Sequence, residues 1–524
     1  MPQPNADASG DRIPPSTELH GTRLIVVTLC AIAATVMQAL DSTIANVALP
    51  YMQGSMAASQ DEINWVLTSY IVATAIMTAP VGFLASRFGR TRLFLTSIIG
   101  FTIASVLCGA AQSLAQIVLF RILQGGFSAA LVPISQGMMY EIYPPAKRSS
   151  AMALWGMGVM VGPVLGPILG GWLTENYNWR WVFYINVPIG ILVTAGTLIY
   201  LRETPRNESS RLDWLGFAAL SIALGAFQMM LDRGEELDWF NAPEIIIEAC
   251  VAGLGMYCFL VHSALVPKPF LSSKLLVDRN FVVACCFSFV VAVVVFSSMA
   301  LLAPYLQTLL NYPVSTAGVL LAPRGLGTMF AMFAAGRLIP YTGERSLIAL
   351  GVLVSVYSLY QMSYWTQDVS ETAIFSVGLW QGFGSGLIFV PLSLFMFSTL
   401  PAELRTEATG VYSLMRNLGS AIGISVTAAL LQTNTQINHA FISGVVTPFN
   451  RALQSGAPER FWNPLSASGA AALDAEVGRQ SSVIAYADDF KLMMLLCIVS
   501  LPLVLLIRPP GAVAVRQPAK AAGE

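Results

Sequence analysis

Charged residues are scarce in this sequence of 524 residues: they make up 11% of it, while hydrophobic residues make up 55%. So few charges cannot solvate the surface of a globular protein of this length, and the apolar residues exceed what one core needs. The net charge of −1, with the basic residues scattered through short segments, also argues against a nucleic-acid partner. The composition predicts an all-α polytopic membrane protein.

Histidine is rarer still, with three residues, and none of the seven cysteines forms a CxxC pair. All the cysteines fall in or beside apolar segments, so we predict neither a metal site nor a disulfide framework. No lysine follows a glycine, which excludes a Walker A loop, and the sequence contains no nucleophile elbow and no HExxH motif. We therefore expect a protein that is not an enzyme, uses no cofactor and depends on an ion gradient or a separate ATPase.

Apolar runs of about 20 residues, the length that crosses the hydrocarbon core of a bilayer, recur fourteen times. They lie near residues 24–46, 63–85, 93–112, 114–139, 150–173, 181–201, 213–231, 244–266, 280–308, 316–338, 346–365, 372–398, 406–431 and 487–507. An even number of spans places both termini on one side. Lysine and arginine are most frequent in the loops of that side, so the positive-inside rule predicts cytoplasmic termini. The first 22 residues lack the apolar region of a signal peptide, so we expect the first span to direct insertion.

Segments near the two ends of the chain repeat each other in parallel. Gly82–Leu93 is similar to Gly336–Leu347 at an offset of 254 (336 − 82), and Gln124–Ser128 is similar to Gln381–Ser385 at an offset of 257 (381 − 124). Nearly constant offsets indicate that spans one to six duplicate spans nine to fourteen. The predicted architecture is the major facilitator fold, with two parallel six-helix bundles and two inserted helices.

The span pattern divides the chain into five parts. They are a cytoplasmic tail (residues 1–22), a first bundle (23–201), a cytoplasmic linker with the two inserted helices (202–279), a second bundle (280–507) and a second cytoplasmic tail (508–524). The second bundle contains a polar periplasmic loop at about 432–486, in which we expect short surface helices; docking of a partner is the alternative. Asp213 is expected to cap the seventh span.

One carboxylate, that of Asp41, interrupts the first span. A carboxylate in an apolar span is costly unless it is paired, hydrated or able to take up a proton, so we interpret Asp41 as a proton carrier. Arg121, in the fourth span, is predicted to lie at a similar depth. A step that changes the separation of this pair would load and release a proton; the alternative is a structural ion pair that holds the two spans together.

Several segments, in the expected order, resemble the signature motifs of the fourteen-span drug:proton antiporters (EmrB/QacA type) of the major facilitator superfamily. These segments are Leu40–Pro50, Gly82–Arg92, Arg121–Gly125, Gly158–Gly171, Trp179–Gly190 and Leu231–Trp239. The resemblance covers essentially the whole chain. It implies alternating access by two bundles that rock about a central cavity.

The resemblance assigns two further groups of residues. The first is a cytoplasmic gate loop, which contains Gly82, Arg87, Gly89 and Arg90. Ser86 stands where the general motif has an Asp, so a gate locked by that carboxylate is not expected. The second group is the antiporter motif of the fifth span, implied to lie between the bundles and to seal one side: Gly158, Gly162, Pro163, Gly166, Pro167 and Gly170. The glycines share one helix face and allow close packing, while the prolines bend the helix.

Other polar residues inside the spans are candidates for the substrate cavity. They are Gln38, Asn46, Gln124, Tyr305, Arg324, Gln381 and Arg416. The two arginines either attract an anionic substrate or bind carbonyl groups at helix breaks, and the sequence does not separate these roles.

The predicted function is proton-driven export of amphipathic or hydrophobic compounds from a bacterial cell. The resemblance implies a location in the inner membrane and two partners, a periplasmic adaptor of the membrane-fusion class and an outer-membrane channel. One alternative is a dedicated exporter of a single metabolite, such as a fatty acid or a siderophore. The other is a transport-inactive membrane sensor or scaffold, against which Asp41 and the glycine ladder argue.

Overall fold

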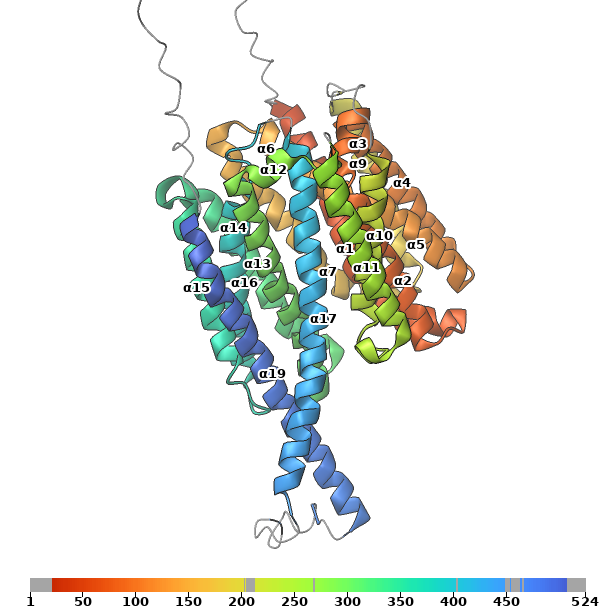
Figure 1. The fold of residues 1–524 in the computed structure, drawn as a ribbon, viewed down its shortest axis with the longest axis vertical. Coiled ribbons are helices and arrows are strands. Elements are labelled where there is room, and N and C mark those ends of the chain that lie inside the picture. The colour runs from red at the N-terminus through yellow and green to blue at the C-terminus, as the bar shows by residue number, and fades with distance from the viewer. Residues whose placement is uncertain are drawn as a thin grey trace, which may run out of the picture.

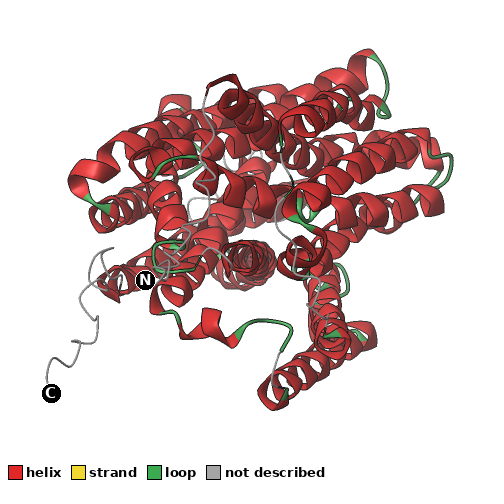
Figure 2. Ribbon diagram, turned by 90° about the horizontal axis from the view of Figure 1, so that it is seen from above, coloured by secondary structure: helices red, strands yellow, loops and turns green. Residues whose placement is uncertain are grey.

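The computed structural model describes residues 21–201, 203, 213–266, 269–401, 404–447, 453, 462–463 and 466–506. In this part of the chain the regular elements are helices, joined by loops and turns, and no strand occurs (Figure 2). Thirteen helices are long and apolar enough to cross a membrane, or fourteen when one bent pair is counted as a span. The predicted all-α polytopic fold is confirmed.

The first bundle contains nine helices and one 3₁₀ turn (Figure 1). They are α1 (Gly21–Met56), α2 (Gln60–Thr78), α3 (Val81–Phe88), α4 (Arg90–Ala110), α5 (Leu114–Ser128), α6 (Leu131–Ile142), η1 (Pro145–Lys147), α7 (Arg148–Asn176), α8 (Trp181–Tyr184) and α9 (Asn186–Tyr200). Two spans that the sequence predicts as continuous are interrupted. The second is bent by 57° between α2 and α3, and the fourth breaks between α5 and α6.

The inserted pair and the second bundle follow. They comprise α10 (Trp214–Arg233), η2 (Trp239–Asn241), α11 (Pro243–Leu265), α12 (Ser273–Val277), α13 (Arg279–Pro304), η3 (Tyr305–Leu309), α14 (Val314–Thr342), α15 (Glu344–Met362), α16 (Glu371–Phe395), α17 (Arg405–Val445) and α19 (Ala467–Leu506). The predicted cap of the seventh span is confirmed, because Asp213 Oδ1 accepts the N–H of Gly216 at 3.0 Å at the start of α10.

A glycine precedes the third membrane span of each half. Gly89 precedes α4 with a φ of 90°, and Gly343 precedes α15 with a φ of 78°. Residues with a Cβ rarely adopt a positive φ, whereas glycine does so at little cost. The two positions are 254 residues apart (343 − 89), so the sequence repeat corresponds here to a repeated backbone conformation.

The two bundles meet along α7 and α14. A Cβ on Gly325 of α14 would lie 2.1 Å from Val164 Cγ2 of α7, and one on Gly336 would lie 2.7 Å from Ala153 Cβ. Such distances are far below van der Waals contact, so only glycine permits this helix spacing. The central position of α7 agrees with the expected interface role of the fifth span.

In the described part of the polar stretch at 432–486, two long helices stand where short surface helices were expected, so that prediction was wrong there. Instead, α17 continues to Val445 and α19 begins at Ala467, and the two helices run on together beyond the other helices (Figure 1). His439 Nε2 and Asp474 Oδ1 lie 3.0 Å apart across this pair, which we call the helical stem. The stem contains too many polar residues to form an apolar run, because a helix pair in water needs only a narrow packed seam.

Candidate functional site

Asp41 and Arg121, predicted as a pair, lie in contact in the interior of the first bundle. Asp41 is in the middle of α1 and Arg121 is in α5, and both side chains have no exposed surface. Arg121 Nη1 lies 2.6 Å from Asp41 Oδ2, which is the distance of a short charge-assisted hydrogen bond. The two charges therefore compensate each other away from solvent.

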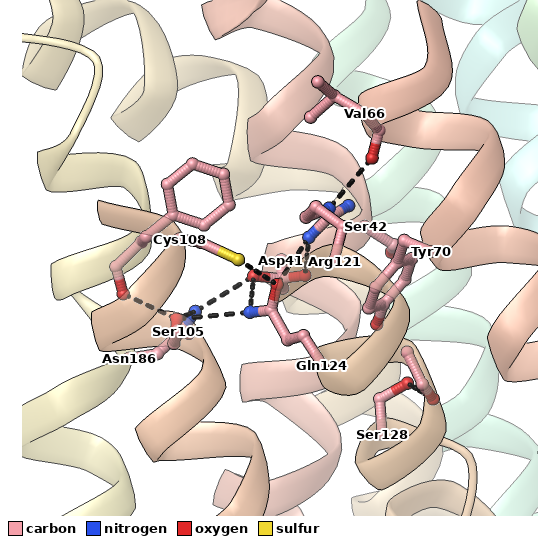
Figure 3. Close-up of polar contacts among 12 residues, drawn as sticks. Asp41, Ser42, Val66, Tyr70, Ser105, Cys108, Arg121, Gln124, Ser128 and Asn186 are labelled. Atoms are coloured by element: carbon pink, nitrogen blue, oxygen red, sulfur yellow. Dashed lines mark hydrogen bonds and ion pairs between the residues drawn. The ribbon is translucent and has the colours of Figure 1, made fainter. Parts of the chain in front are cut away.

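The second carboxylate oxygen of Asp41 accepts hydrogen bonds from two amides (Figure 3). Gln124 Nε2 donates at 2.7 Å and Asn186 Nδ2 donates at 3.1 Å. Both amides also donate to Ser105 Oγ of α4, at 3.2 and 3.0 Å. Side chains from α1, α4, α5 and α9 thus form one buried polar network. Among the described residues, Arg121 Nη2 and Asn186 Oδ1 of this network have no hydrogen-bond partner.

Arg121 has several partners besides Asp41. Its Nε donates to the carbonyl of Val66 at 3.0 Å, and Nη1 also donates to Gln124 Oε1 at 2.8 Å. Its guanidinium carbon lies 4.0 Å from the ring centroid of Tyr70 and 5.7 Å from that of Phe183. Aromatic rings attract a cation through their negative faces. The arginine is therefore held by α2, α5 and α8 as well as by the carboxylate.

Several contacts of Arg121 do not depend on the charge of Asp41. When Asp41 is ionised, it pairs with Arg121. When it is protonated, the arginine retains the Val66 carbonyl, the Gln124 amide oxygen and the Tyr70 ring. An isolated buried charge costs roughly several kcal/mol, and these contacts reduce that cost when Asp41 is neutral.

Sequence reasoning missed three members of this network. Asn186 and Ser105 bind the carboxylate or its amides, and Tyr70 lies against the guanidinium. Each is a single polar residue in an apolar span, a pattern that usually indicates ordinary packing. The available signal was Asn186, because it lies inside Trp179–Gly190, a segment that resembles the antiporter signatures but that had no assigned role.

The glycine ladder of α7 packs against α1 beside this site. A Cβ on Gly162 would lie 2.5 Å from the backbone carbon of Ala39, and one on Gly166 would lie 2.1 Å from Thr43 Oγ1. Thr43 Oγ1 also donates to the Gly162 carbonyl at 3.1 Å. These glycines thus hold α1 close to α7 on both sides of Asp41.

This arrangement corrects one detail of the expected ladder. The glycines were implied to lie between the bundles, but the face carrying Gly158, Gly162, Gly166 and Gly170 contacts α1 of the same bundle. The contact with the second bundle is made by other α7 residues, such as Gly156, where a Cβ would lie 2.9 Å from Met332 Sδ. The prolines, Pro163 and Pro167, both lie inside α7.

The predicted gate loop lies against the second bundle. A Cβ on Gly82 would lie 2.6 Å from Glu407 Cα of α17, so the two backbones touch. Arg90 forms an ion pair with Glu141 of α6, while Arg87 is half-buried and its Nη1 has no hydrogen-bond partner among the described residues. Gly89 supplies the positive φ between α3 and α4. At this end the bundles are in contact.

The other cavity candidates are dispersed. Gln38 is half-buried and Asn46 is exposed on α1. Gln124 belongs to the Asp41 network. Tyr305 is 1% exposed and its hydroxyl donates to the carbonyl of Thr366 at 3.1 Å, within an aromatic cluster of Trp365, Tyr486 and Phe490. The structure therefore does not gather these four residues into one site.

The second bundle brings Arg324 and Gln381 together through Ser298. Arg324 Nη2 donates to Ser298 Oγ at 2.9 Å, and Gln381 Nε2 donates to the same oxygen at 3.0 Å. Arg416 of α17 is half-buried beside Tyr412. Within the described part of the chain, neither arginine forms an ion pair.

A helical bundle of thirteen or fourteen spans, duplicated in two halves and carrying a buried charge pair, defines a multi-pass membrane transporter. The family model of the Major Facilitator Superfamily matches residues 31–424, and the chain belongs to this superfamily of transporters. The family predicted from the motifs is thus confirmed.

Two relatives are similar over most of their length. The multidrug export protein EmrB of Escherichia coli K12 is 38% identical over 443 residues, which are 83% of this chain and 86% of EmrB. The fatty acid resistance protein FarB of Neisseria gonorrhoeae is 35% identical over 495 residues, which are 94% of this chain and 97% of FarB. The predicted likeness to EmrB-type multidrug exporters is confirmed.

Solved structures support the fold. The human organic anion transporter MFSD10 superposes with a TM-score of 0.59 at 15% identity, covering 91% of this chain and 100% of the transporter. The proton:xylose symporter XylE superposes with a TM-score of 0.57 at 14% identity, covering 90% of this chain and 95% of XylE. At such low identity these likenesses concern the major facilitator fold alone.

Proposed function

We propose that this protein is a proton-driven multidrug efflux transporter that exports amphipathic or hydrophobic compounds by alternating access. The observation that carries the proposal is the fully buried Asp41–Arg121 pair, in which the carboxylate can release the arginine without leaving either group alone. The relationship to EmrB, a multidrug export protein, supports small-molecule export. A proton gradient would be the sole source of energy, with no bound cofactor.

In this proposal, protons enter from the outside and substrate leaves from the cytoplasmic side. The contact between Gly82 and Glu407 closes one end of the path, and the proposed opening of that contact exposes the cavity to the cytoplasm. When this end is closed, Arg87 and Arg90 would stabilise the closed state by binding near the C-terminal ends of helices. The distribution of basic residues supports cytoplasmic termini.

We further propose that the protein is the inner-membrane component of a tripartite pump. Its partners would be a periplasmic adaptor of the membrane-fusion class and an outer-membrane channel, as the resemblance to EmrB-type pumps implies. The helical stem of α17 and α19 supports this proposal, because it extends beyond the other helices on the side opposite the gate loop (Figure 1).

Export of a fatty acid is a second candidate. The supporting observation is the similarity to FarB, a fatty acid resistance protein, which extends over 94% of this chain. A dedicated exporter and a multidrug exporter would differ in the number of compounds transported, so a substrate panel separates them.

The decisive experiment is uptake of a lipophilic dye, Hoechst 33342, by everted membrane vesicles under an imposed pH gradient. We expect gradient-driven uptake by the wild type and uptake at the background level by Asp41→Asn, because an amide cannot carry a proton. Equal gradient-driven uptake by both proteins would remove Asp41 from the proton path. If uptake by the wild type does not depend on the pH gradient, antiport itself is contradicted.

Asp488→Asn is the matched control. Asp488 lies on α19, is 44% exposed and pairs with Lys491 at 3.0 Å, so it undergoes the same change of charge outside the network. We expect its uptake to equal that of the wild type. Loss of uptake by both variants would indicate a general loss of folding or of membrane insertion.

A further inference from the structure

The second bundle repeats the helix packing and the glutamine of the Asp41 site, but not its carboxylate. Gln124 donates to Asp41 at 2.7 Å, and its repeat partner Gln381 donates to Ser298 at 3.0 Å. Asp41 and Ser298 are 257 residues apart (298 − 41), which is the offset of the two glutamines (381 − 124). A neutral hydroxyl therefore takes the place that the first bundle gives to an anion.

The cation of the second bundle comes from a different helix. The repeat partner of Arg121 is Gly378 (121 + 257), so the fourth helix of this half has no cation at that position. Arg324 lies on α14 instead, 254 residues after Tyr70 (324 − 70), the residue that packs on Arg121 in the first bundle. The positive charge has thus moved from the fourth helix of the bundle to the second.

Packing supports this correspondence. A Cβ on Gly125 would lie 2.5 Å from the carbonyl oxygen of Tyr70, and a Cβ on its repeat partner Gly382 would lie 1.9 Å from that of Arg324. The same close approach of two helices is therefore kept in both halves, and only the charged side chains have changed their helix.

Arg324 is a buried cation without a compensating anion. Its side chain is 9% exposed, and Nη2 donates to the Val295 carbonyl at 2.7 Å and to Ser298 Oγ at 2.9 Å. Its Nη1 is buried and has no hydrogen-bond partner among the described residues. A buried charge of this kind is rare unless a ligand or a partner neutralises it.

Space for a methyl group and unused donors lie beside the arginine. Gly378 is buried, yet a Cβ there would meet a single atom within 4 Å, the Arg324 backbone N at 4.0 Å. The Gln381 amide has two hydrogens, of which the described contacts use one, for Ser298. Nη1 of the arginine and this amide hydrogen are both available to an acceptor.

We propose that Arg324, Ser298 and Gln381 bind the anionic head group of an exported amphipath, with a carboxylate as the ligand class. The planar guanidinium fork matches the two oxygens of a carboxylate, and charge-assisted hydrogen bonds are about twice as strong as neutral ones. The head group would supply the anion that Asp41 supplies in the first bundle. This inference rests on the proposed export function, because it names the substrate class of that transporter.

The test is calorimetric binding of decanoate to the purified protein in phosphatidylcholine nanodiscs, with decyltrimethylammonium as a cation of equal chain length. We expect Arg324→Gln to weaken decanoate binding by about ten- to hundredfold, while binding of the cation is unchanged. Arg324→Lys should retain part of the affinity. Arg337→Gln, at an exposed position on the same helix, should bind like the wild type.

Ser298→Asp provides a second test that keeps the arginine. The introduced carboxylate lies within reach of Arg324 and Gln381, so it should occupy the site and abolish decanoate binding, whereas Ser298→Asn should not. Undiminished decanoate binding by Ser298→Asp or by Arg324→Gln would overturn the proposal, as would a wild type that does not bind decanoate. Displacement of decanoate by added phosphatidylglycerol would overturn it in favour of a lipid site.

Hoechst 33342 transport by the same variants separates this inference from the proposed function. We expect the wild type and Arg337→Gln to show gradient-driven transport of the dye. Unchanged binding of decyltrimethylammonium by Arg324→Gln shows that this variant is folded. One outcome is that Arg324→Gln loses decanoate binding and the wild type does not transport the dye. This outcome would support the anion site and contradict the export function. Wild-type transport with equal decanoate binding by both proteins would contradict the anion site alone.

Discussion

The two bundles have the same backbone packing and different charges. The first holds Asp41 and Arg121 as a compensated pair, whereas the second holds Arg324 beside a serine and a glutamine. In both halves a glycine that follows the shared glutamine presses against the second helix of the bundle. Duplication of a scaffold therefore leaves its polar side chains free to diverge, and we attribute proton exchange to one half and anion recognition to the other.

Substitution of the two arginines should give the largest difference in stability between the two bundles. Arg121→Ala leaves Asp41 buried and unpaired, so we expect the free energy of unfolding to fall by about 3–5 kcal/mol. Arg324→Ala removes a cation that no carboxylate compensates. The loss of its hydrogen bonds, about 1–2 kcal/mol, is therefore partly offset by the removal of an unpaired buried charge. Denaturant unfolding in detergent micelles measures both.

A second substitution checks the cause of the larger loss. In the Arg121→Ala background, Asp41→Asn should recover part of the stability, because it removes the unpaired charge. Equal losses for Arg121→Ala and Arg324→Ala would contradict the difference between the bundles.

Close helix packing should respond alike in both halves. Gly162→Ala brings a Cβ to 2.5 Å from the Ala39 backbone, and Gly419→Ala brings one to 2.5 Å from the Phe289 carbonyl oxygen. Overpacking of this kind costs about 1–3 kcal/mol, which thermal unfolding in detergent detects. Gly171→Ala is the control, since nothing lies within 4 Å of its Cβ and alanine favours the helix. A loss in one half alone would show that the packing is not equivalent.

The shared glutamines should differ between the bundles by less than the two arginines do. Gln124→Leu removes donors to Asp41 and Ser105 and should cost about 1–3 kcal/mol, because it leaves buried groups unsatisfied. Gln381→Leu loses one hydrogen bond to Ser298 and also removes the buried Oε1, which has no partner among the described residues, so its cost should be about 1 kcal/mol or less. Unfolding free energies that reverse this order would refute the assignment of the fuller network to the first bundle.

Much of the fold follows from the sequence, because hydrocarbon imposes both the length and the apolarity of a span. The repeat offsets also relate two of the glycines with positive φ, Gly89 and Gly343. The break between α2 and α3 and the helical stem were not predicted. Apolar runs carry no information on bends, and the stem is helical although its composition is polar.

The centre of the candidate site was predictable and its periphery was not. Asp41 and Arg121 are conspicuous because a charge inside a span is costly. Asn186 and Ser105 become meaningful only when tertiary structure brings their polar atoms to the carboxylate. The same limit applies to Arg324, for which the sequence left substrate binding and carbonyl binding as alternatives. In the structure its Nη2 donates to a carbonyl, while its Nη1 has no partner among the described residues.

The helix α17 links the two ends of the second bundle as a single rod. Its 41 residues span about 60 Å at 1.5 Å per residue, about twice the thickness of the hydrocarbon core. One end of the rod, at Glu407, rests on the gate loop, and the other end forms the stem. A rigid rod that pivots about its middle is a lever: any tilt that separated Glu407 from Gly82 would displace the tip of the stem by a comparable distance in the opposite direction.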